Sequence, residues 1–169
     1  MEEGYRGKDT MAVRKKMKPE TSMVNITEKQ VVRRKAVAEG SIKLSRESIN
    51  TIQSGRSEKG DVLAVAEVAG ISAAKRTSEL IPLCHQIPLN SVEISFRMGQ
   101  RELRCRSTVE AEWRTGVEME ALTAVAASLL TVWDMVKRTE KDEDGQYPGT
   151  AIEWITVKSK RKAVQIGRP

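Results

Sequence analysis

The stretch VEISFRMGQRELRCRSTVEAEW, residues 92–113, alternates apolar and polar side chains on both sides of the pair Gly99-Gln100. Successive side chains of a strand point to opposite faces of a sheet, so this alternation predicts two strands that each bury one face. Glycine favours a tight turn between them, and the stretch is therefore predicted to form an antiparallel hairpin. Cys105 falls on the apolar side of the second strand, which favours a place in the core over a chemical role.

The same two-residue period precedes the hairpin, from Val32 to Leu44. It predicts another half-buried strand, with one exception, because Arg34 falls on the apolar side. A charged group in that position is costly unless it is compensated. Arg34 is therefore expected either to belong to a buried ion pair or to contact a ligand.

Two helices are predicted between these strands. Ser45 can cap a short helix that Gly55 ends, and Asp61 can cap a helix that runs to about Ala74. Small side chains in the second helix permit close packing against a neighbour.

A third, longer helix follows the hairpin. TGVE (115–118) has the form of a capping box, and apolar residues at helical spacing continue to about Lys137. A polar loop at 141–150 and a last strand from Ile152 to Lys160 complete the pattern. The order of elements predicts an α+β sandwich with helices on one face of a mainly antiparallel sheet.

The 169 residues are expected to form a single domain at 23–160, with a flexible N-terminal extension at 1–22 and a basic C-terminal tail at 161–169. We see no apolar run long enough to suggest a membrane span and no signal-peptide pattern. The two cysteines lack a C-x-x-C motif, which argues against a disulfide framework or a zinc site. These features predict a cytoplasmic protein that contacts no membrane.

A formal net charge of +6 favours polyanionic partners such as nucleic acid or nucleotide phosphates. A nucleic-acid-binding module is the rival hypothesis to an enzyme. However, aromatic residues make up only 4% of the chain, and no groove-reading motif is present. We therefore expect no nucleic-acid partner.

Polar residues with potential chemical roles are few. His85, in LCHQIP, is the only histidine, so a multi-histidine metal site is excluded, and we predict no metal site. His85 could be a structural residue or a rigid binding group. Lys59 lies beside Gly60 before a helix start, where it could meet a phosphate or simply be solvated.

Acidic residues occur at both ends of the long helix. Glu118 and Glu120 could converge on a ligand if the helix entry were partly extended, or could simply favour the helix N-terminus. Asp134 and Lys137 are three residues apart and could form a surface ion pair or an acid/base couple. Glu118 and Asp134 are sixteen positions apart, or about 24 Å along a helix, so one chain cannot bring both into one small-molecule pocket.

Two long motifs, KGDVLAVAEVAGISAAKRTSELIPLCHQIPL (59–89) and TGVEMEALTAVAASLLTVWDMVK (115–137), resemble those of the cyclic pyranopterin monophosphate synthase family of molybdenum cofactor biosynthesis. The resemblance spans about residues 23–158, and the chain looks like an archaeal member. It implies a ferredoxin-like fold and a lyase. The implied reaction converts 3′,8-cyclo-7,8-dihydroguanosine 5′-triphosphate to cyclic pyranopterin monophosphate and pyrophosphate. It also implies a cytoplasmic homohexamer, a trimer of dimers with active sites at subunit interfaces.

The resemblance also implies roles for individual residues. The expected catalytic residues, with the two lysines desolvated and titrating near neutrality, are Lys59, Asp134 and Lys137. The expected substrate-binding residues are Arg34, Leu83, Cys84, His85, Glu118, Met119, Glu120 and Lys158. No tightly bound cofactor is implied, although Mg²⁺ could accompany the triphosphate. The chain departs from the family's glycine-rich C-terminal run, reading KSKRKAV (158–164), and it inserts EDGQYPG (143–149) before the last strand.

Overall fold

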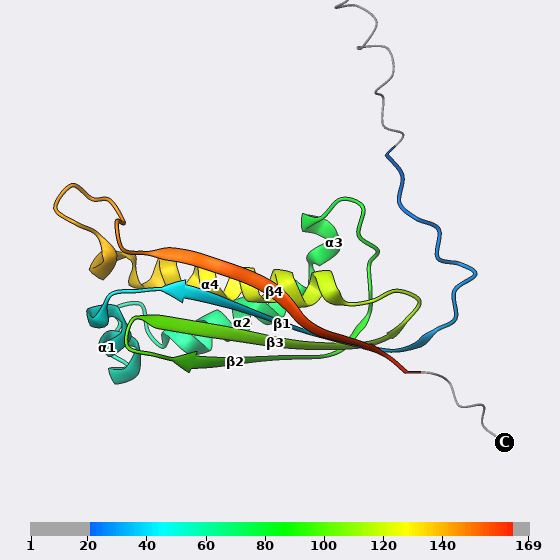
Figure 1. Ribbon diagram of the computed structural model, residues 1–169, viewed down its shortest axis with the longest axis horizontal. Helices are drawn as coiled ribbons and strands as arrows, with labels where there is room; N and C mark the ends of the chain where they lie inside the picture. The colour runs from blue at the N-terminus through cyan, green and yellow to red at the C-terminus, as the bar shows by residue number, and fades with distance from the viewer. Residues whose placement is uncertain (1–20, 164–169) are drawn as a thin grey trace, which may run out of the picture.

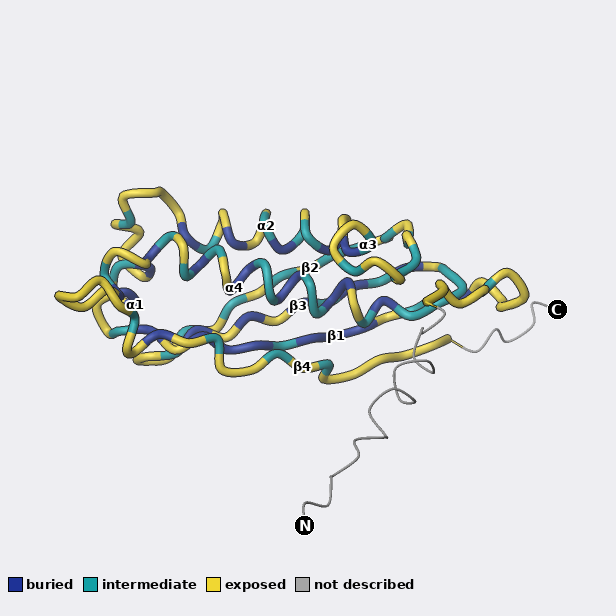
Figure 2. The backbone as a smooth tube through the Cα atoms, turned by 90° about the horizontal axis from the view of Figure 1, so that it is seen from above, coloured by how far each residue is buried: buried dark blue, intermediate teal, exposed yellow. Residues whose placement is uncertain are grey.

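The protein, a computed structural model, is described for residues 21–163 (Figure 1). Four strands form one sheet in the order β2-β3-β1-β4, and every neighbouring pair is antiparallel. The long helices cover one face of this sheet, as seen from the side in Figure 2. The elements are β1 (Val32–Lys43), α1 (Arg46–Ser54), α2 (Val62–Lys75), α3 (Thr77–Leu80), β2 (Leu89–Met98), β3 (Glu102–Trp113), α4 (Glu118–Glu140) and β4 (Ala151–Lys162). The predicted α+β, ferredoxin-like sandwich is confirmed.

β1 is a central strand, and its helix-facing side is lined with small residues. At Gly40 an added Cβ would lie 2.7 Å from Val125 Cγ1 and 2.9 Å from the carbonyl oxygen of Trp154. The absence of a side chain at Gly40 therefore lets α4 pack directly on the sheet. On the opposite face Ser41 is also buried, and its hydroxyl donates a hydrogen bond to Glu102 of β3 at 2.7 Å.

α4 is the core helix of the fold. Buried side chains recur along it, and half of its apolar window lies inside the fold. By length and composition alone α4 could cross a membrane, so the expectation that no such run exists was wrong. The apolar composition of α4 is instead explained by the burial of its side chains in the core. α2 lies close against α4, where an added Cβ at Gly70 would approach Ser128 Oγ to 2.2 Å.

The predicted helix ends are mostly confirmed. Ser45 Oγ accepts a hydrogen bond from the Ser48 amide, and Gly55 ends α1 with φ of 65°. Asp61 caps α2 through the amides of Leu63 and Ala64. The capping box at 115–118 was wrong, because α4 begins at Glu118 with Val117 at its N-cap and no side-chain cap bond.

Cys105 is fully buried, and this burial raises the pKa of its thiol to about 12, as befits a core residue. β4 ends at Lys162 and so includes the first two residues, 161 and 162, of the expected tail. The first twenty residues of the expected N-terminal extension and the tail beyond residue 163 lie outside the described part of the chain.

Candidate active site

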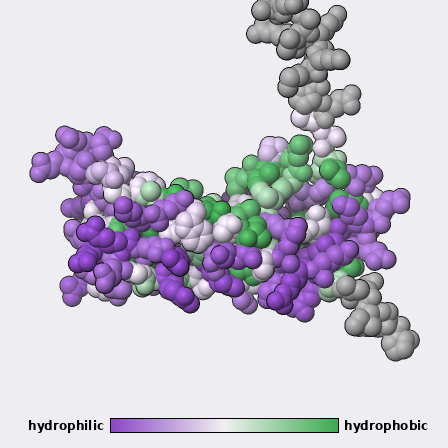
Figure 3. Space-filling view, viewed as in Figure 1, coloured by the Kyte–Doolittle hydropathy of each residue, from purple (hydrophilic) through white to green (hydrophobic). Residues whose placement is uncertain are grey.

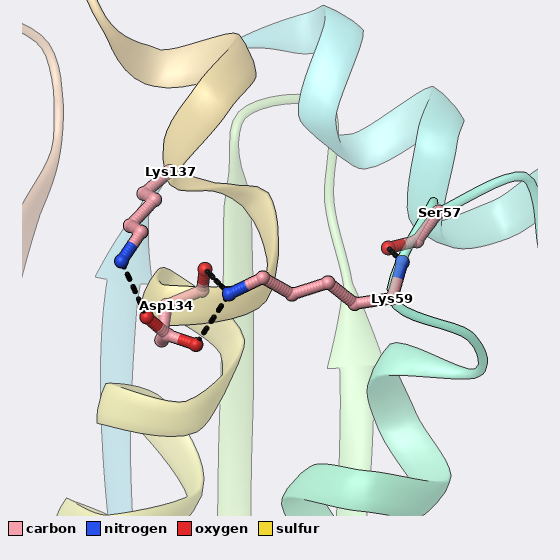
Figure 4. A network of polar contacts seen from close by, with 4 residues as sticks. All are labelled: Ser57, Lys59, Asp134 and Lys137. Atoms are coloured by element: carbon pink, nitrogen blue, oxygen red, sulfur yellow. Dashed lines mark hydrogen bonds and ion pairs between the residues drawn. The ribbon is translucent and has the colours of Figure 1, made fainter.

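Three predicted catalytic residues meet at the C-terminal half of α4 (Figure 4). The Lys59 ammonium donates to Asp134 Oδ2 at 2.7 Å and to the Asp134 carbonyl at 3.0 Å. Lys137 donates to the other carboxylate oxygen at 2.8 Å. Lys59 reaches α4 from the loop after α1, where Gly60 adopts a φ of 95° and Asp61 starts α2. Lys59 and Asp134, which are 75 positions apart in the sequence, are thus joined by a hydrogen bond.

We call Lys59, Asp134 and Lys137 the triad, and their opposite charges stabilise one another. Hydrogen bonds from Lys137 and then Lys59 lower the pKa of Asp134 to about 2, and the bond to Asp134 raises the pKa of Lys137. Both lysine side chains are 47% exposed. Neither lysine is therefore desolvated in the single chain, contrary to the expectation, and for Lys137 the Asp134 carboxylate favours the charged form.

The triad borders a cleft of about 370 Å³, which we call the lysine cleft. Its walls come from α1, from the loop that carries Lys59 and from the last turns of α4. Arg138 pairs with Glu58 at its rim, and Arg56 also lines it. Besides the triad the cleft is lined by two cations, Arg56 and Arg138, and two anions, Glu47 and Glu58.

The opposite end of α4 borders a second cleft, of about 410 Å³, which we call the glutamate cleft. His85 lies on its wall with Nε2 2.7 Å from the Val24 carbonyl oxygen. Figure 3 shows an apolar surface around α3 and the segment that follows, where Leu80 is 63% and Leu83 50% exposed. Six predicted substrate-binding residues line this cleft together: Leu83, Cys84, His85, Glu118, Met119 and Glu120.

The two glutamates have different environments although both lie in the first turn of α4 rather than on extended backbone. Glu120 is only 3% exposed, and its Oε2 has no hydrogen-bond partner among residues 21–163. Burial, together with the nearby Glu118 charge, raises the pKa of Glu120. Burial also acts on Glu118, but hydrogen bonds from Lys160 and from its own amide bring its pKa below the ordinary value. Glu118 is therefore the more acidic member of the pair.

Cys84 lies beside these glutamates but is not activated as a nucleophile. Burial and the charge of Glu120 both raise the pKa of its thiol. A thiolate would need the opposite environment, with a cation or a helix N-terminus close to the sulfur. Cys84 can therefore contribute packing and shape to the glutamate cleft.

A third cleft, of about 570 Å³, adjoins the glutamate cleft at Gly116 and Glu118. Arg34 lines this basic cleft and donates to the carbonyls of Trp113 at 3.4 Å and Arg114 at 3.3 Å. Arg34 is thus held by backbone oxygens rather than by a carboxylate in a buried ion pair. The cationic residues of the basic cleft are Lys29, Arg34, Lys35, Arg114, Lys160, Arg161 and Lys162.

Lys158 does not line any of these three clefts. Two irregularities in the β1–β4 pairing leave Lys158 and Glu153 without a partner on β1. Lys158 lies on the outer face of the sheet, 4.0 Å from Glu39 and 6.0 Å from the centroid of the Trp154 ring. In the single chain it is therefore separated from the other predicted binding residues.

Lys160, rather than Lys158, is the β4 lysine that contacts Glu118. It pairs with Ala36 of β1, on the side that faces the helices, and donates to Glu118 Oε1 at 2.9 Å. Sequence reasoning missed it because a bulge at Lys158 resets the alternation of β4. The only sequence signal was the density of lysines in KSKRK.

The glutamate and lysine clefts lie at the two ends of one helix. α4 is uninterrupted from Glu118 to Glu140, so Glu118 and Asp134 are about 24 Å apart along its axis. The structure confirms the predicted separation. It also divides predicted residues between two separate clefts, with His85 and Glu120 at one and Asp134 at the other.

The carboxylates do not suit a resident divalent metal. Within residues 21–163 no three His, Cys, Asp or Glu side chains are arranged to hold an ion. Both oxygens of Asp134 already accept hydrogen bonds from ammonium groups. A cation at that carboxylate would have to displace a lysine, so the donor set does not fit Mg²⁺.

The chain is similar to known proteins over most of its length. A protein of Sulfurisphaera tokodaii named probable cyclic pyranopterin monophosphate synthase is 54% identical over 143 residues, covering 85% of this chain and 95% of that protein. Proteins of the same name from Thermococcus kodakarensis and Pyrococcus abyssi are 55% and 56% identical, each over 83% of this chain and over 90% and 88% of their own lengths. The family model described as MoaC family matches residues 23–163, which contain every residue of the three clefts, and the chain belongs to that family.

Proposed function

We propose that this chain is a cyclic pyranopterin monophosphate synthase of molybdenum cofactor biosynthesis and, more finely, a phosphorus–oxygen lyase. Its substrate would be 3′,8-cyclo-7,8-dihydroguanosine 5′-triphosphate, and its products cyclic pyranopterin monophosphate and pyrophosphate. Three relatives that are 54%, 55% and 56% identical over the aligned residues carry the name probable cyclic pyranopterin monophosphate synthase. The observation that carries the proposal is the assembly of all six LCH and EME residues around a single cleft.

The glutamate cleft is suited to the purine-derived end of the substrate. Glu118 is anionic and can accept hydrogen bonds from the amino and ring N–H groups of such a base. Glu120 is buried with a free carboxyl oxygen, so a ligand N–H could satisfy an atom that no described residue reaches. A ligand that donates a hydrogen bond to this oxygen would thus offset the cost of burying it without a partner.

The basic cleft is suited to the triphosphate. Its cations lie next to the glutamate cleft, so a nucleotide could span both. In the proposed cyclisation a sugar hydroxyl loses its proton and attacks the α-phosphorus, a new P–O bond forms, and the bond to the β-phosphate breaks. Arg34 and neighbouring lysines would stabilise the negative charge that develops on the departing pyrophosphate. Lys158 stays a proposed phosphate contact, one that a second subunit would have to bring close.

The lysine cleft would supply the proton transfers of ring opening and closure. We assign Lys59 and Lys137 as general acid and base, with Asp134 as the ionised group that orients both ammonium groups. The charged lysines are suited to donate protons first. To act as bases near neutral pH they would need desolvation, which closure by a second subunit and substrate could provide.

A homodimer could bring the glutamate cleft of one subunit to the lysine cleft of the other. Each cleft would then be one half of an active site, and we call the two clefts half-sites. Ala126 is the midpoint between Glu118 and Asp134, so two antiparallel α4 helices related by a twofold axis near Ala126 would bring the ends together. The half-buried side chains there, Ala126 and Ala127, are small enough for close approach. Exposed apolar residues flank them, with Leu130 58% and Val68 of α2 64% exposed. We propose that three such dimers form the functional hexamer.

The remaining assignments follow from this reaction. Mg²⁺ would enter with the triphosphate rather than as a resident ion, and no tightly bound cofactor is required. The substrate derives from GTP, so we place the protein in the cytoplasm, without a membrane or nucleic-acid partner. Binding to random DNA that persists at moderate salt would favour the rival nucleic-acid function.

The direct test is incubation of the purified chain with the cyclised nucleotide. We expect equal amounts of pyrophosphate and of a pterin that carries a cyclic phosphate. The matched control is unmodified GTP, which should release no pyrophosphate because it lacks the bond between C3′ of the ribose and C8 of the purine. Absence of both products from a correctly folded oligomer would refute the proposal.

A further inference from the structure

The loop between α4 and β4 is a built element rather than an open connection. The Asp142 amide donates to the Gln146 carbonyl at 3.0 Å, and the Gln146 amide donates to Asp142 Oδ1 at 2.7 Å. Gly145 has φ of 76°, a conformation that favours glycine. We call residues 141–150 the α4–β4 loop.

A buried carboxylate closes the base of this loop. Glu140 is 8% exposed and accepts hydrogen bonds from the Thr150 hydroxyl and, at 2.8 Å, from the Ser45 amide. Glu140 therefore joins the end of α4 to the start of α1 and to the start of β4. Figure 1 shows the loop projecting from the same end of the molecule as α1, which also contributes to the lysine cleft.

The loop places one aromatic ring on α4. The rings of Tyr147 and Trp133 meet edge to face, with centroids 5.8 Å apart and planes at 81°. The Lys141 ammonium lies 6.0 Å from the centroid of the Tyr147 ring. Aromatic pairs in this arrangement gain about 0.5–1.5 kcal/mol beyond their buried area, so the contact can fix the position of the loop.

Trp133 connects this contact to the triad. It directly precedes Asp134, and Lys137 follows it by four residues, so Trp133 and Lys137 lie on the same side of α4. The phenol of Tyr147 is close enough to act electrostatically on Lys137, adding to the effect of Asp134 in raising its pKa. The Tyr147 ring thus lies beside the turn from which Lys137 projects.

We propose that Tyr147 is a positioning residue, which packs on Trp133 and thereby holds the Lys137 side chain against Asp134. The inference rests on the proposed function and adds to it a residue of the inserted segment 143–149, outside the motifs that carry the family resemblance. A lysine has several rotatable bonds, so a wall on one side reduces the positions that its ammonium can take. Tyr147 itself needs no contact with the substrate.

The test compares Tyr147→Ala with Tyr147→Phe in the full-length protein. Removal of the ring should lower kcat for pyrophosphate release about tenfold with little change in KM, because only the placement of Lys137 is lost. Phenylalanine keeps the packing on Trp133 and should restore most of kcat. In parallel, ¹⁵N NMR of labelled lysine side chains should show a lower titration midpoint for Lys137 in the alanine variant.

Lys141→Ala is the matched control, because it removes the other neighbour of the Tyr147 ring, at the C-cap of α4, and leaves the Tyr147–Trp133 contact in place. It should leave kcat and the Lys137 titration unchanged. Unchanged kcat and titration in Tyr147→Ala would overturn the proposal, and so would a phenylalanine variant as impaired as the alanine variant. If Tyr147→Ala does not fold, Tyr147→Leu keeps the volume of the contact and permits the same readings. The titration requires no turnover, so it tests Tyr147 even if the wild-type protein makes no product.

Discussion

Glu118 and Asp134 lie sixteen residues apart on one uninterrupted helix, and each belongs to a different cleft. The helix keeps them about 24 Å apart, farther than a single nucleotide base and sugar can bridge. Lys59 and Asp134, by contrast, are hydrogen-bonded within one chain. A single chain therefore brings Lys59 and Asp134 together but holds Glu118 and Asp134 apart.

Mixing two inactive variants tests the proposed union of half-sites. Glu118→Gln and Asp134→Asn should each abolish turnover, yet activity should return after subunit exchange. In a random mixture half of the subunit pairs are mixed, and each mixed pair has one intact site of two, so about a quarter of wild-type activity is expected. Pyrophosphate release after verified exchange measures the result.

The matched control for this experiment mixes Lys59→Ala with Asp134→Asn. Both changes fall in the same half-site, so every site in a mixed pair contains one of them, and no activity should return. Equal rescue in the two mixtures, or rescue in neither, would count against a site shared between subunits.

Asp134→Asn alone should lower turnover at least about a hundredfold, the usual scale for loss of acid–base organisation. The side chain is 56% exposed, so the melting temperature should barely change. The pKa of Lys137, which Asp134 raises, should fall when the negative charge is removed. Lysine NMR and circular dichroism measure both effects. Glu79→Gln, which breaks an exposed ion pair with Arg76, is the control, and near-normal turnover of Asp134→Asn would exclude the residue from the mechanism.

Lys160→Ala should change the glutamate cleft, whereas Lys158→Ala should not. The hydrogen bond from Lys160 helps to lower the pKa of Glu118, so that pKa should rise in Lys160→Ala and substrate binding should weaken. Lys158 pairs with Glu39 on the outer face, so its removal should leave the Glu118 titration unaltered. Carbon-detected NMR of the glutamate carboxyl groups distinguishes the two variants. An unchanged Glu118 titration in Lys160→Ala would disprove the assignment.

Glu140→Gln should destabilise the fold by about 1–3 kcal/mol, because an amide nitrogen would face the donors that the carboxylate now accepts. Although burial opposes it, hydrogen bonds from Ser48, Thr150 and Ser45 lower the pKa of Glu140. Its stabilising effect is therefore complete above the unfolded pKa of about 4.3 and is lost as the pH falls through the lower folded pKa.

Urea unfolding at several pH values checks this prediction. The difference in free energy of unfolding between the wild-type protein and Glu140→Gln should be largest near pH 7 and shrink below about pH 4. Glu143→Gln, an exposed position in the α4–β4 loop, serves as the control. A difference that grows toward acid would mean that Glu140 is protonated in the folded protein.

Much of the fold was predictable because its signals are local. The alternation around Gly99-Gln100 and the run of apolar residues after Gly116 arise from side chains two to four positions apart. The caps at Ser45 and Asp61 likewise need only the next few amides. The distance between Glu118 and Asp134 also followed from helical rise alone, since no distant contact can shorten a continuous helix.

The sequence by itself therefore determined the α+β architecture and the separation of Glu118 from Asp134 along one helix. Only the tertiary structure decided that Lys59 and Lys137 share the Asp134 carboxylate and that Lys160 rather than Lys158 meets Glu118. It also decided that Glu120 is buried with one oxygen that no residue of the described range 21–163 bonds. The charge of each group depends on partners tens of residues away, and the bulge in β4 depends on its pairing with β1. Local periodicity reports which face a side chain occupies, but desolvation and ion pairing are set by what the rest of the chain brings against that face.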